Sequence, residues 1–272
     1  MSGRTILFTT LILLPAIFGR HIEYSRTRRG LGGVMKHSRN TRNGNSNVNP
    51  HLRMRSIPPE FLYVSLGDNK VLECEAGGNP PPTIHWLKNG KRIQQNPMEM
   101  NEVDDGNFDT NPQLGLSFTK SRLFIDCATE QDTGEYTCVA QNPYYRISTN
   151  TKIETNNKSK ITEDAFCLTK KSYGIPARIY MWTHIRMEYT GSDVQLFCRV
   201  AGKPEPAVKW INQDDELVQK SEKYEILDSG DLIIRDIDWS DMGNYVCITK
   251  NIHGTDQSST FLYPSKREKV MN

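Results

Sequence analysis

Two stretches of the chain alternate apolar and polar residues. In one, Val71 is followed by Cys74 and Ala76, and in the other, residues 194–200 place Val, Leu, Cys and Val at every second position. A period of two predicts β-strands with one buried face. Proline-rich segments at 79–82 and 203–206 end each of these strands.

A larger pattern surrounds the two strands. The sequence D-x-G-x-Y-x-C occurs at residues 132–138 and again at 241–247. In each copy a Trp follows the first Cys by 12 residues, and a Leu precedes the last Cys by 15. The five positions are Cys74, Trp86, Leu123, Tyr136 and Cys138 in the first copy, and Cys198, Trp210, Leu232, Tyr245 and Cys247 in the second. Matching spacing at both ends indicates a tandem repeat.

This pattern is typical of an immunoglobulin-like β-sandwich. Its two cysteines bridge facing sheets, its Trp packs on the bridge, and its Tyr hydrogen-bonds backbone at a corner. We therefore expect an all-β chain of two tandem immunoglobulin-like domains of the I-set type. The expected bridges are Cys74–Cys138 and Cys198–Cys247, and the structural core residues are Trp86, Tyr136, Trp210 and Tyr245.

Two cysteines, Cys127 and Cys167, remain. Cys127 aligns with the charged Asp236 of the second copy, so it should face outward at the end of its strand. Cys167 lies 29 residues after Cys138, just past the expected last strand of the first domain. We predict a Cys127–Cys167 bridge that pins the interdomain segment. Two free thiols or an intermolecular bridge are the alternatives.

The ends of the chain differ from its body. Arg4, an apolar run at 6–18 and Gly19 are typical of a secretory signal peptide over residues 1–19. Residues 20–56 hold nine Lys/Arg and one acid, whereas residues 57–272 carry a net charge of −7. We expect a disordered basic tail at 20–56, domains at 57–155 and 175–264, a linker at 156–174 and a polar tail at 265–272. No later segment is apolar enough to anchor the chain in a membrane.

Three local motifs suggest modification or binding. Residues 26–29, RTRR, resemble a convertase cleavage motif, so the chain is predicted to be cut after Arg29. The remaining basic residues of the tail could hold glycosaminoglycan; the alternative is a solvated tail with no specific partner. Asn157 opens a glycosylation sequon. The first repeat is 15 residues longer than the second, and its acidic insertion at 94–117 is either a recognition loop or an unpartnered one.

No catalytic group or cofactor site is evident. The six histidines, His21, His37, His51, His85, His184 and His253, show no metal-ligand spacing. The acidic run at 104–109 lacks the spacing of a calcium loop. With every cysteine assigned to a bridge, no nucleophile stands out. We expect a protein that is not an enzyme and has no metal or cofactor.

The two domains, the signal peptide and the lack of an anchor resemble the small secreted two-immunoglobulin-domain (zwei-Ig) proteins of nematodes. Residues 179–198 also resemble a segment of the related insect two-domain protein that binds insulin-like peptides. The resemblance implies a secreted role in the nervous system that maintains axon position, through an unidentified extracellular or cell-surface protein. It implies, as an alternative, sequestration of an insulin-like peptide. Tyr144, Tyr145 and Trp182 are weak candidates for that contact, because aromatic residues more often pack in a core.

Overall fold

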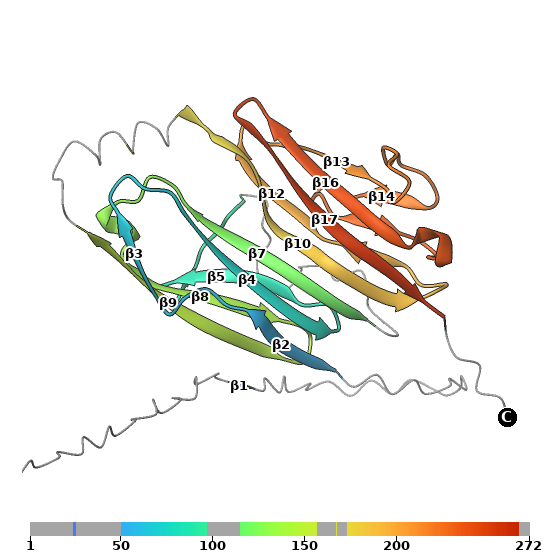
Figure 1. The fold of residues 1–272 in the computed structure, drawn as a ribbon, viewed down its shortest axis with the longest axis horizontal. Coiled ribbons are helices and arrows are strands. Elements are labelled where there is room, and N and C mark those ends of the chain that lie inside the picture. Colours follow the sequence, from blue (N-terminus) through green and yellow to red (C-terminus); the bar gives the residue numbers. More distant parts are fainter. Residues whose placement is uncertain (1–23, 26–49, 97–114, 157–166, 168–172, 267–272) are drawn as a thin grey trace, which may run out of the picture.

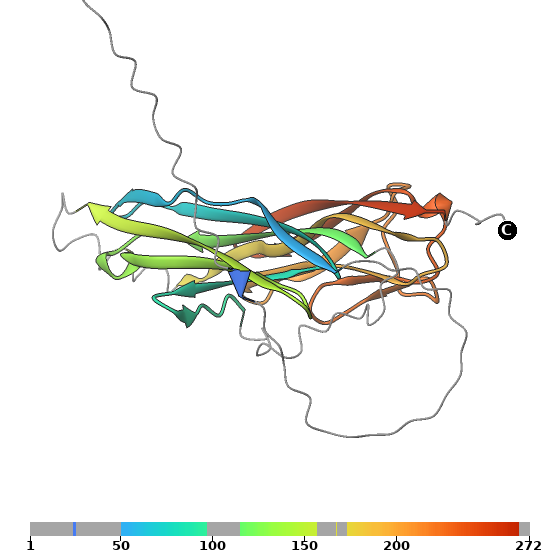
Figure 2. The same cartoon turned by 90° about the horizontal axis from the view of Figure 1, so that it is seen from below.

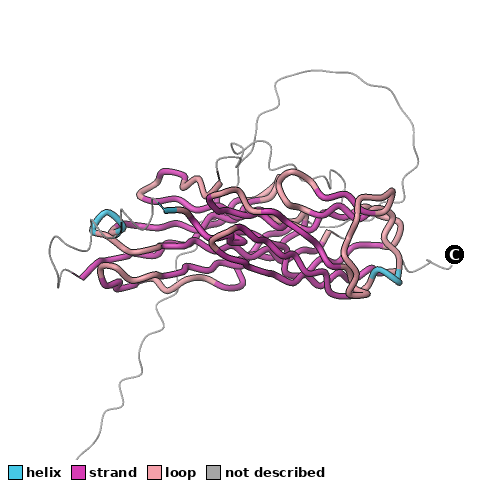
Figure 3. The backbone as a smooth tube through the Cα atoms, turned by 90° about the horizontal axis from the view of Figure 1, so that it is seen from above, coloured by secondary structure: helices cyan, strands magenta, loops and turns pink. Residues whose placement is uncertain are grey.

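A computed structural model describes residues 24–25, 50–96, 115–156, 167 and 173–266. Its regular elements are almost all strands (Figure 3). The strands that precede the interdomain segment are β1 (Tyr24–Ser25), β2 (His51–Ser56), β3 (Phe61–Ser65), β4 (Lys70–Asn79), β5 (Thr83–Lys88), β6 (Lys91–Arg92), β7 (Leu116–Ile125), β8 (Gly134–Gln141) and β9 (Arg146–Asn156). Those that follow it are β10 (Ile175–Tyr189), β11 (Val194–Leu196), β12 (Cys198–Lys203), β13 (Ala207–Ile211), β14 (Tyr224–Ile226), β15 (Leu232–Ile234), β16 (Gly243–Asn251) and β17 (Gly254–Ser265).

The first domain is a two-layer sandwich. One layer contains β2, β4 and β7, and the other contains β3, β9, β8, β5 and β6, with β1 beside β9. Strand β2 corrects the sequence analysis, which placed residues through Ser56 in a disordered tail. His51–Ser56 instead pairs antiparallel with β4 and buries Leu52 in the core. Burial of Leu52 and part of Met54 on one face stabilises this strand.

The second domain has one unusually long strand. Strand β10 pairs antiparallel with β12 in its first half and parallel with β17 in its second half. It thereby contributes to both layers of the sandwich. One layer contains β17, β16 and β13. The other contains β12 and a small separate sheet of β11, β15 and β14.

The two domains share a sheet. Strand β7 of the first domain pairs antiparallel with β10 of the second, from Met181 opposite Ser121 to Met187 opposite Leu116. The result is an eight-stranded sheet with the order β13-β16-β17-β10-β7-β4-β2, and β12 also on β10 (Figure 1). We call it the joined sheet. The domains therefore overlap along the length of the molecule instead of touching only at their ends (Figure 2).

The two domains have equivalent residues at the centre of their cores. Trp86 and Trp210 are fully buried, and each indole donates a hydrogen bond, to Ser121 Oγ at 3.0 Å and to the carbonyl of Gly230 at 2.9 Å. Disulfides join Cys74 to Cys138 and Cys198 to Cys247 across the two layers. A third disulfide joins Cys127 to Cys167, with 5.4 Å between the Cα atoms. This is the pairing that the sequence favours.

The corner before each last cysteine is also repeated. Short 3-10 turns, η1 (Glu130–Asp132) and η2 (Trp239–Asp241), precede β8 and β16 and lie at opposite ends of the molecule (Figure 3). In each, the last Asp of the turn caps the backbone at its start. The hydroxyls of Tyr136 and Tyr245 donate to the carbonyls of Asp132 and Asp241. The two turns lie at opposite ends because β7 and β10 pair antiparallel, so the long axes of the two domains run in opposite directions.

Candidate binding surface

The described residues contain no group of His, Cys, Asp and Glu side chains that could hold a metal ion. No helix within the same residues is long and apolar enough to cross a membrane. His85 is buried in the first domain, and His184 lies 3.1 Å from Glu75.

The junction between the domains is packed as a core. Tyr180, Met181 and Phe197 of the second domain lie in the hydrophobic cluster of the first. The Met181 sulfur is 3.4 Å from the backbone nitrogen of Ile84, and Ser121 Oγ donates to the Tyr180 carbonyl at 2.8 Å. These contacts hold the joined sheet together at β7 and β10.

Charged side chains cross the same junction. The Arg122 guanidinium lies 4.5 Å from the centre of the Trp182 ring and within 4.0 Å of Asp256. Arg178 of β10 pairs with Asp126 of the first domain. A polar contact between His184 Nδ1 and Glu75 Oε1, at 3.1 Å, crosses the same junction. These pairs are partly exposed, so they position the domains more than they stabilise them.

The outer face of the joined sheet carries apolar residues from both domains. Phe118 of β7 lies opposite Ile185 of β10, and Ile185 lies opposite Phe261 of β17. Residues directly opposite each other in a ladder point to the same face of a sheet. The next residues on the same face, two positions away on each strand, are paired in the same way: Met187 of β10 lies opposite Leu116 of β7 and Tyr263 of β17. We call these six residues the apolar row.

The apolar row is accessible. Phe261 is 38% exposed, and the other five side chains are half-buried. The intervening residues on β17, such as Leu262, point into the domain and are buried. A row of apolar side chains that two domains build together can bury a ligand surface across the junction.

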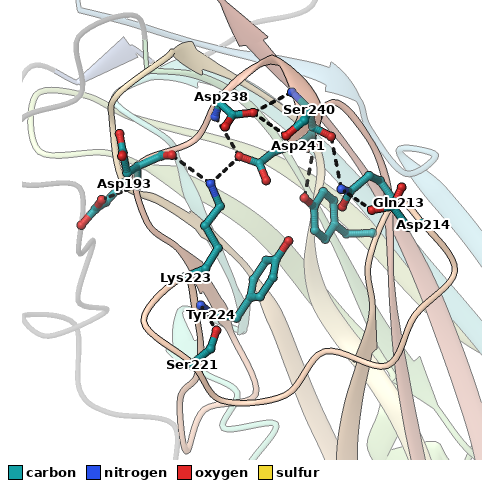
Figure 4. Close-up of polar contacts among 11 residues, drawn as sticks. Asp193, Gln213, Asp214, Ser221, Lys223, Tyr224, Asp238, Ser240 and Asp241 are labelled. Carbon is teal, nitrogen blue, oxygen red and sulfur yellow. Dashed lines mark hydrogen bonds and ion pairs between the residues drawn. The ribbon is translucent and has the colours of Figure 1, made fainter.

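The end of the second domain near η2 is polar, and its charged side chains are hydrogen-bonded within the domain (Figure 4). Lys223 Nζ donates to Asp241 Oδ2 at 2.6 Å and to the carbonyl of Asp236 at 2.9 Å. Two hydrogen bonds from Ser240 lower the pKa of Asp238, and burial raises the pKa of Tyr245 and of Tyr224. A shallow hollow of about 620 Å³ lies beside Tyr224, lined also by Leu217 and Val218. Because the charges pair with each other, this end is a structural corner.

The structure separates the three aromatic candidates. Tyr144 is 53% exposed at the turn between β8 and β9, and Tyr145 packs partly against the first core. Trp182 is buried in the second core at 5% exposure, so it cannot be an exposed contact residue. Arg29, Asn157, the signal peptide and most of the insertion at 94–117 lie outside the described residues.

Sequence reasoning did not find the apolar row. Its members come from three strands that are far apart in the chain, and only the pairing of β7 with β10 brings them together. The one available signal was in β10, where Ile185 and Met187 alternate with the charged Arg186 and Glu188. That signal favours a strand, but it does not identify the strand's neighbours.

The chain matches the immunoglobulin domain family over residues 50–142 and the immunoglobulin I-set domain family over residues 186–263. It is 32% identical to Zwei Ig domain protein zig-4 of Caenorhabditis elegans, over 78% of this chain and 79% of that protein. It is 36% identical to zig-2 of the same organism, over 76% and 83%. A crystal structure of neural ectodermal development factor IMP-L2 is similar, with a TM-score of 0.60 and 25% identity over 81% of this chain and 97% of that one. The IMP-L2 sequence of Drosophila melanogaster is 28% identical, over 80% and 78%.

Proposed function

The chain belongs to the family of two-immunoglobulin-domain proteins that includes the zwei Ig domain proteins, and on this premise we propose that it is an extracellular binding protein. It acts without catalysis, by modulating adhesion at neuronal surfaces, and it maintains the position of axons and neurons. The name of the similar factor IMP-L2 refers to neural development, which supports a role in that tissue.

One observation carries this proposal. The apolar row is built from strands of both domains and lies on a sheet that runs through them without a break. The shared core at Met181 and Phe197 fixes the row's geometry, so little conformational entropy is lost when a partner binds. The partner is a cell-surface or extracellular protein that covers the row.

Rescue of animals that lack the protein tests the role. The unmodified chain should restore axon position, and Phe261→Ser should not, because it removes the most exposed side chain of the row. Val71→Ser is the matched control, since Val71 is also exposed, at 51%, but lies outside the row. Normal axons in the null animal, or full rescue by Phe261→Ser, would contradict the proposal.

A second function is sequestration of an insulin-like peptide, which the resemblance to the insect protein implies. The apolar row favours it, because a small helical peptide could lay its apolar face across β7, β10 and β17. Titration of insulin-like peptides against the purified protein tests it. Binding should be lost in Phe261→Ser and kept in Val71→Ser, and no binding at micromolar peptide would exclude this function.

Secretion and processing are part of the proposal. Residues 1–19 direct export, a protease cuts after Arg29, and Asn157 carries a glycan. Mass spectrometry of protein from the culture medium tests all three. Gly30 should be the first residue, and a peptide N-glycosidase should convert Asn157 to Asp. Retention inside the cell would contradict the extracellular role.

A further inference from the structure

The shallow hollow of about 620 Å³ opens at one edge of the second domain. It lies between the segment 216–219, which follows β13, and Tyr224 at the start of β14. Figure 4 shows Tyr224 beside the loop that carries Ser221. Leu217, Val218 and Tyr224 supply its apolar part, and Leu217 is 53% exposed. The hollow therefore offers apolar surface that a ligand can cover.

The backbone beside the hollow has an unused hydrogen-bonding edge. Leu217 forms an antiparallel bridge with Ile211 at the end of β13, and the two hydrogen bonds of this bridge, both 2.9 Å long, are donated by the amides of Val218 and Asn212. Leu217 is therefore in a non-hydrogen-bonded pair, so its own N–H and C=O point away from β13. Neither group has a hydrogen-bond partner within the described residues. An extended peptide can add to such an edge as a further strand.

The Asn212 side chain adds a donor to the wall of the hollow. It is 9% exposed, and its Oδ1 accepts the backbone amides of Asp214 and Glu216 at 3.1 Å and 2.8 Å. Its Nδ2 donates to no residue that the structure describes, although Asn212 lines the hollow. Leaving a buried amide donor without an acceptor costs free energy, so the site favours a ligand that brings a carbonyl group.

The rim of the hollow is acidic. From Asn212 to Glu222 the chain has four acids and one lysine. Asp215, Glu216 and Glu222 are exposed and form no ion pair with any described residue, whereas Lys223 is paired within the η2 corner. The rim acids belong to no group of side chains within the described residues that could hold a metal ion. They instead complement a lysine or arginine, whose stem can lie on the apolar part while its charged end reaches the rim.

We propose that this hollow binds an extended, basic peptide segment of an extracellular partner. The peptide pairs with the free edge of Leu217, and one of its carbonyls accepts from Asn212. An arginine or lysine of the peptide lies over Tyr224 and ends among the rim acids. The hollow is at β13, which β16 separates from β17, the nearest strand of the apolar row. The proposal therefore goes beyond the proposed function and is tested independently of it.

Amide NMR spectra of the full secreted chain test the proposal. The probe is a capped six-residue peptide in which arginine alternates with valine, a composition that favours an extended strand. The amide shifts that it causes should be largest from Asn212 to Tyr224. D215N/E216Q should weaken its binding about tenfold, because two rim charges are lost. E205Q/D228N is the control, since it removes the same charge from two exposed acids elsewhere in the domain. Unchanged affinity in D215N/E216Q, an equal loss in the control, or no shift at millimolar peptide would overturn the proposal.

Two further measurements separate peptide recognition from attraction by charge alone. N212D keeps the oxygen that accepts the two loop amides, but it removes the donor and adds a negative charge. Binding of the probe should weaken, and tighter binding would overturn the proposal. A probe with glutamate in place of arginine should not bind, and equal binding would overturn it as well. Thermal unfolding of D215N/E216Q should match the parent chain, because Asp215 has a φ of 62°, which asparagine also adopts.

Discussion

Tyr136 and Tyr245 occupy equivalent places in the two domains, and both side chains are buried. Each hydroxyl is a hydrogen-bond donor to a carbonyl of the preceding corner, at 2.9 Å and 3.2 Å. Burial raises the pKa of both above the ordinary tyrosine value of 10.0. The hydroxyls are therefore neutral in the folded protein at every pH that it meets in tissue.

This burial predicts a loss of stability in alkali. Unfolded tyrosine loses its proton near pH 10, whereas folded Tyr136 and Tyr245 keep theirs, so the unfolding free energy should fall as pH rises above 10. Y136F/Y245F should cost about 1 kcal/mol per site at pH 7 and flatten this alkaline fall. Urea titrations between pH 7 and 11 measure both effects. If the unfolding free energy of the variant falls as steeply above pH 10 as that of the parent chain, the two tyrosines are not the cause of the fall.

At the scale of elements, Gly77 determines how β4 and β7 pack. The Phe118 ring occupies the space over β4 where a side chain would stand, and Arg55 stacks on the ring from the far side. With a larger side chain at position 77 of β4, Arg55 of β2 could not reach the Phe118 ring of β7.

We expect Gly77→Ala to destabilise the first domain by about 1–3 kcal/mol, because the new methyl group overlaps the ring. In the Phe118→Ala background the same change should cost much less, since the ring is gone. Denaturant unfolding of the two single variants and the double variant measures this coupling. Additive costs would show that the ring moves away freely and that the contact does not constrain the strands.

The third disulfide links an element of the first domain to the segment that leads to the second. Cys127 and Cys167 are 40 residues apart, so the bridge closes a loop that includes β8 and β9. C127S/C167S should lower the free energy of unfolding by about 4 kcal/mol in the chain-entropy account, and by less if the native bridge is strained. Unfolding under non-reducing conditions measures the loss, and a change below about 1 kcal/mol would contradict it.

The elements that the sequence predicts best are those whose side chains form a disulfide or a specific hydrogen bond. The Cys, Trp and Tyr positions predicted both sandwiches, because a bridge, an indole and a hydroxyl each need a fixed partner in this fold. Strand β2 was missed, although His51, Leu52, Arg53 and Met54 alternate, because the basic composition of the segment outweighed a short pattern. The pairing of β7 with β10 was invisible, since it joins backbone groups and depends on which edges the two folded domains leave open.

At the scale of the molecule, the two domains share both a sheet and a core. Separating them would break the β7–β10 ladder and expose Met181 and Phe197, which are 2% and 1% exposed. Tandem domains joined only by a linker have no such cost and can move independently. The apolar row is therefore held in a fixed geometry by the two domains together.

The whole molecule should consequently unfold as one unit. Calorimetry should give a single transition whose van't Hoff and calorimetric enthalpies agree. Leu72→Ala removes a side chain buried only in the first core and should cost about 2–5 kcal/mol. Because the domains unfold together, this change should lower hydrogen-exchange protection of the amides in β16 of the second domain as much as in β8 of the first. If β16 keeps its protection while β8 loses it, the domains are thermodynamically separate, and the joined sheet contributes geometry without cooperativity.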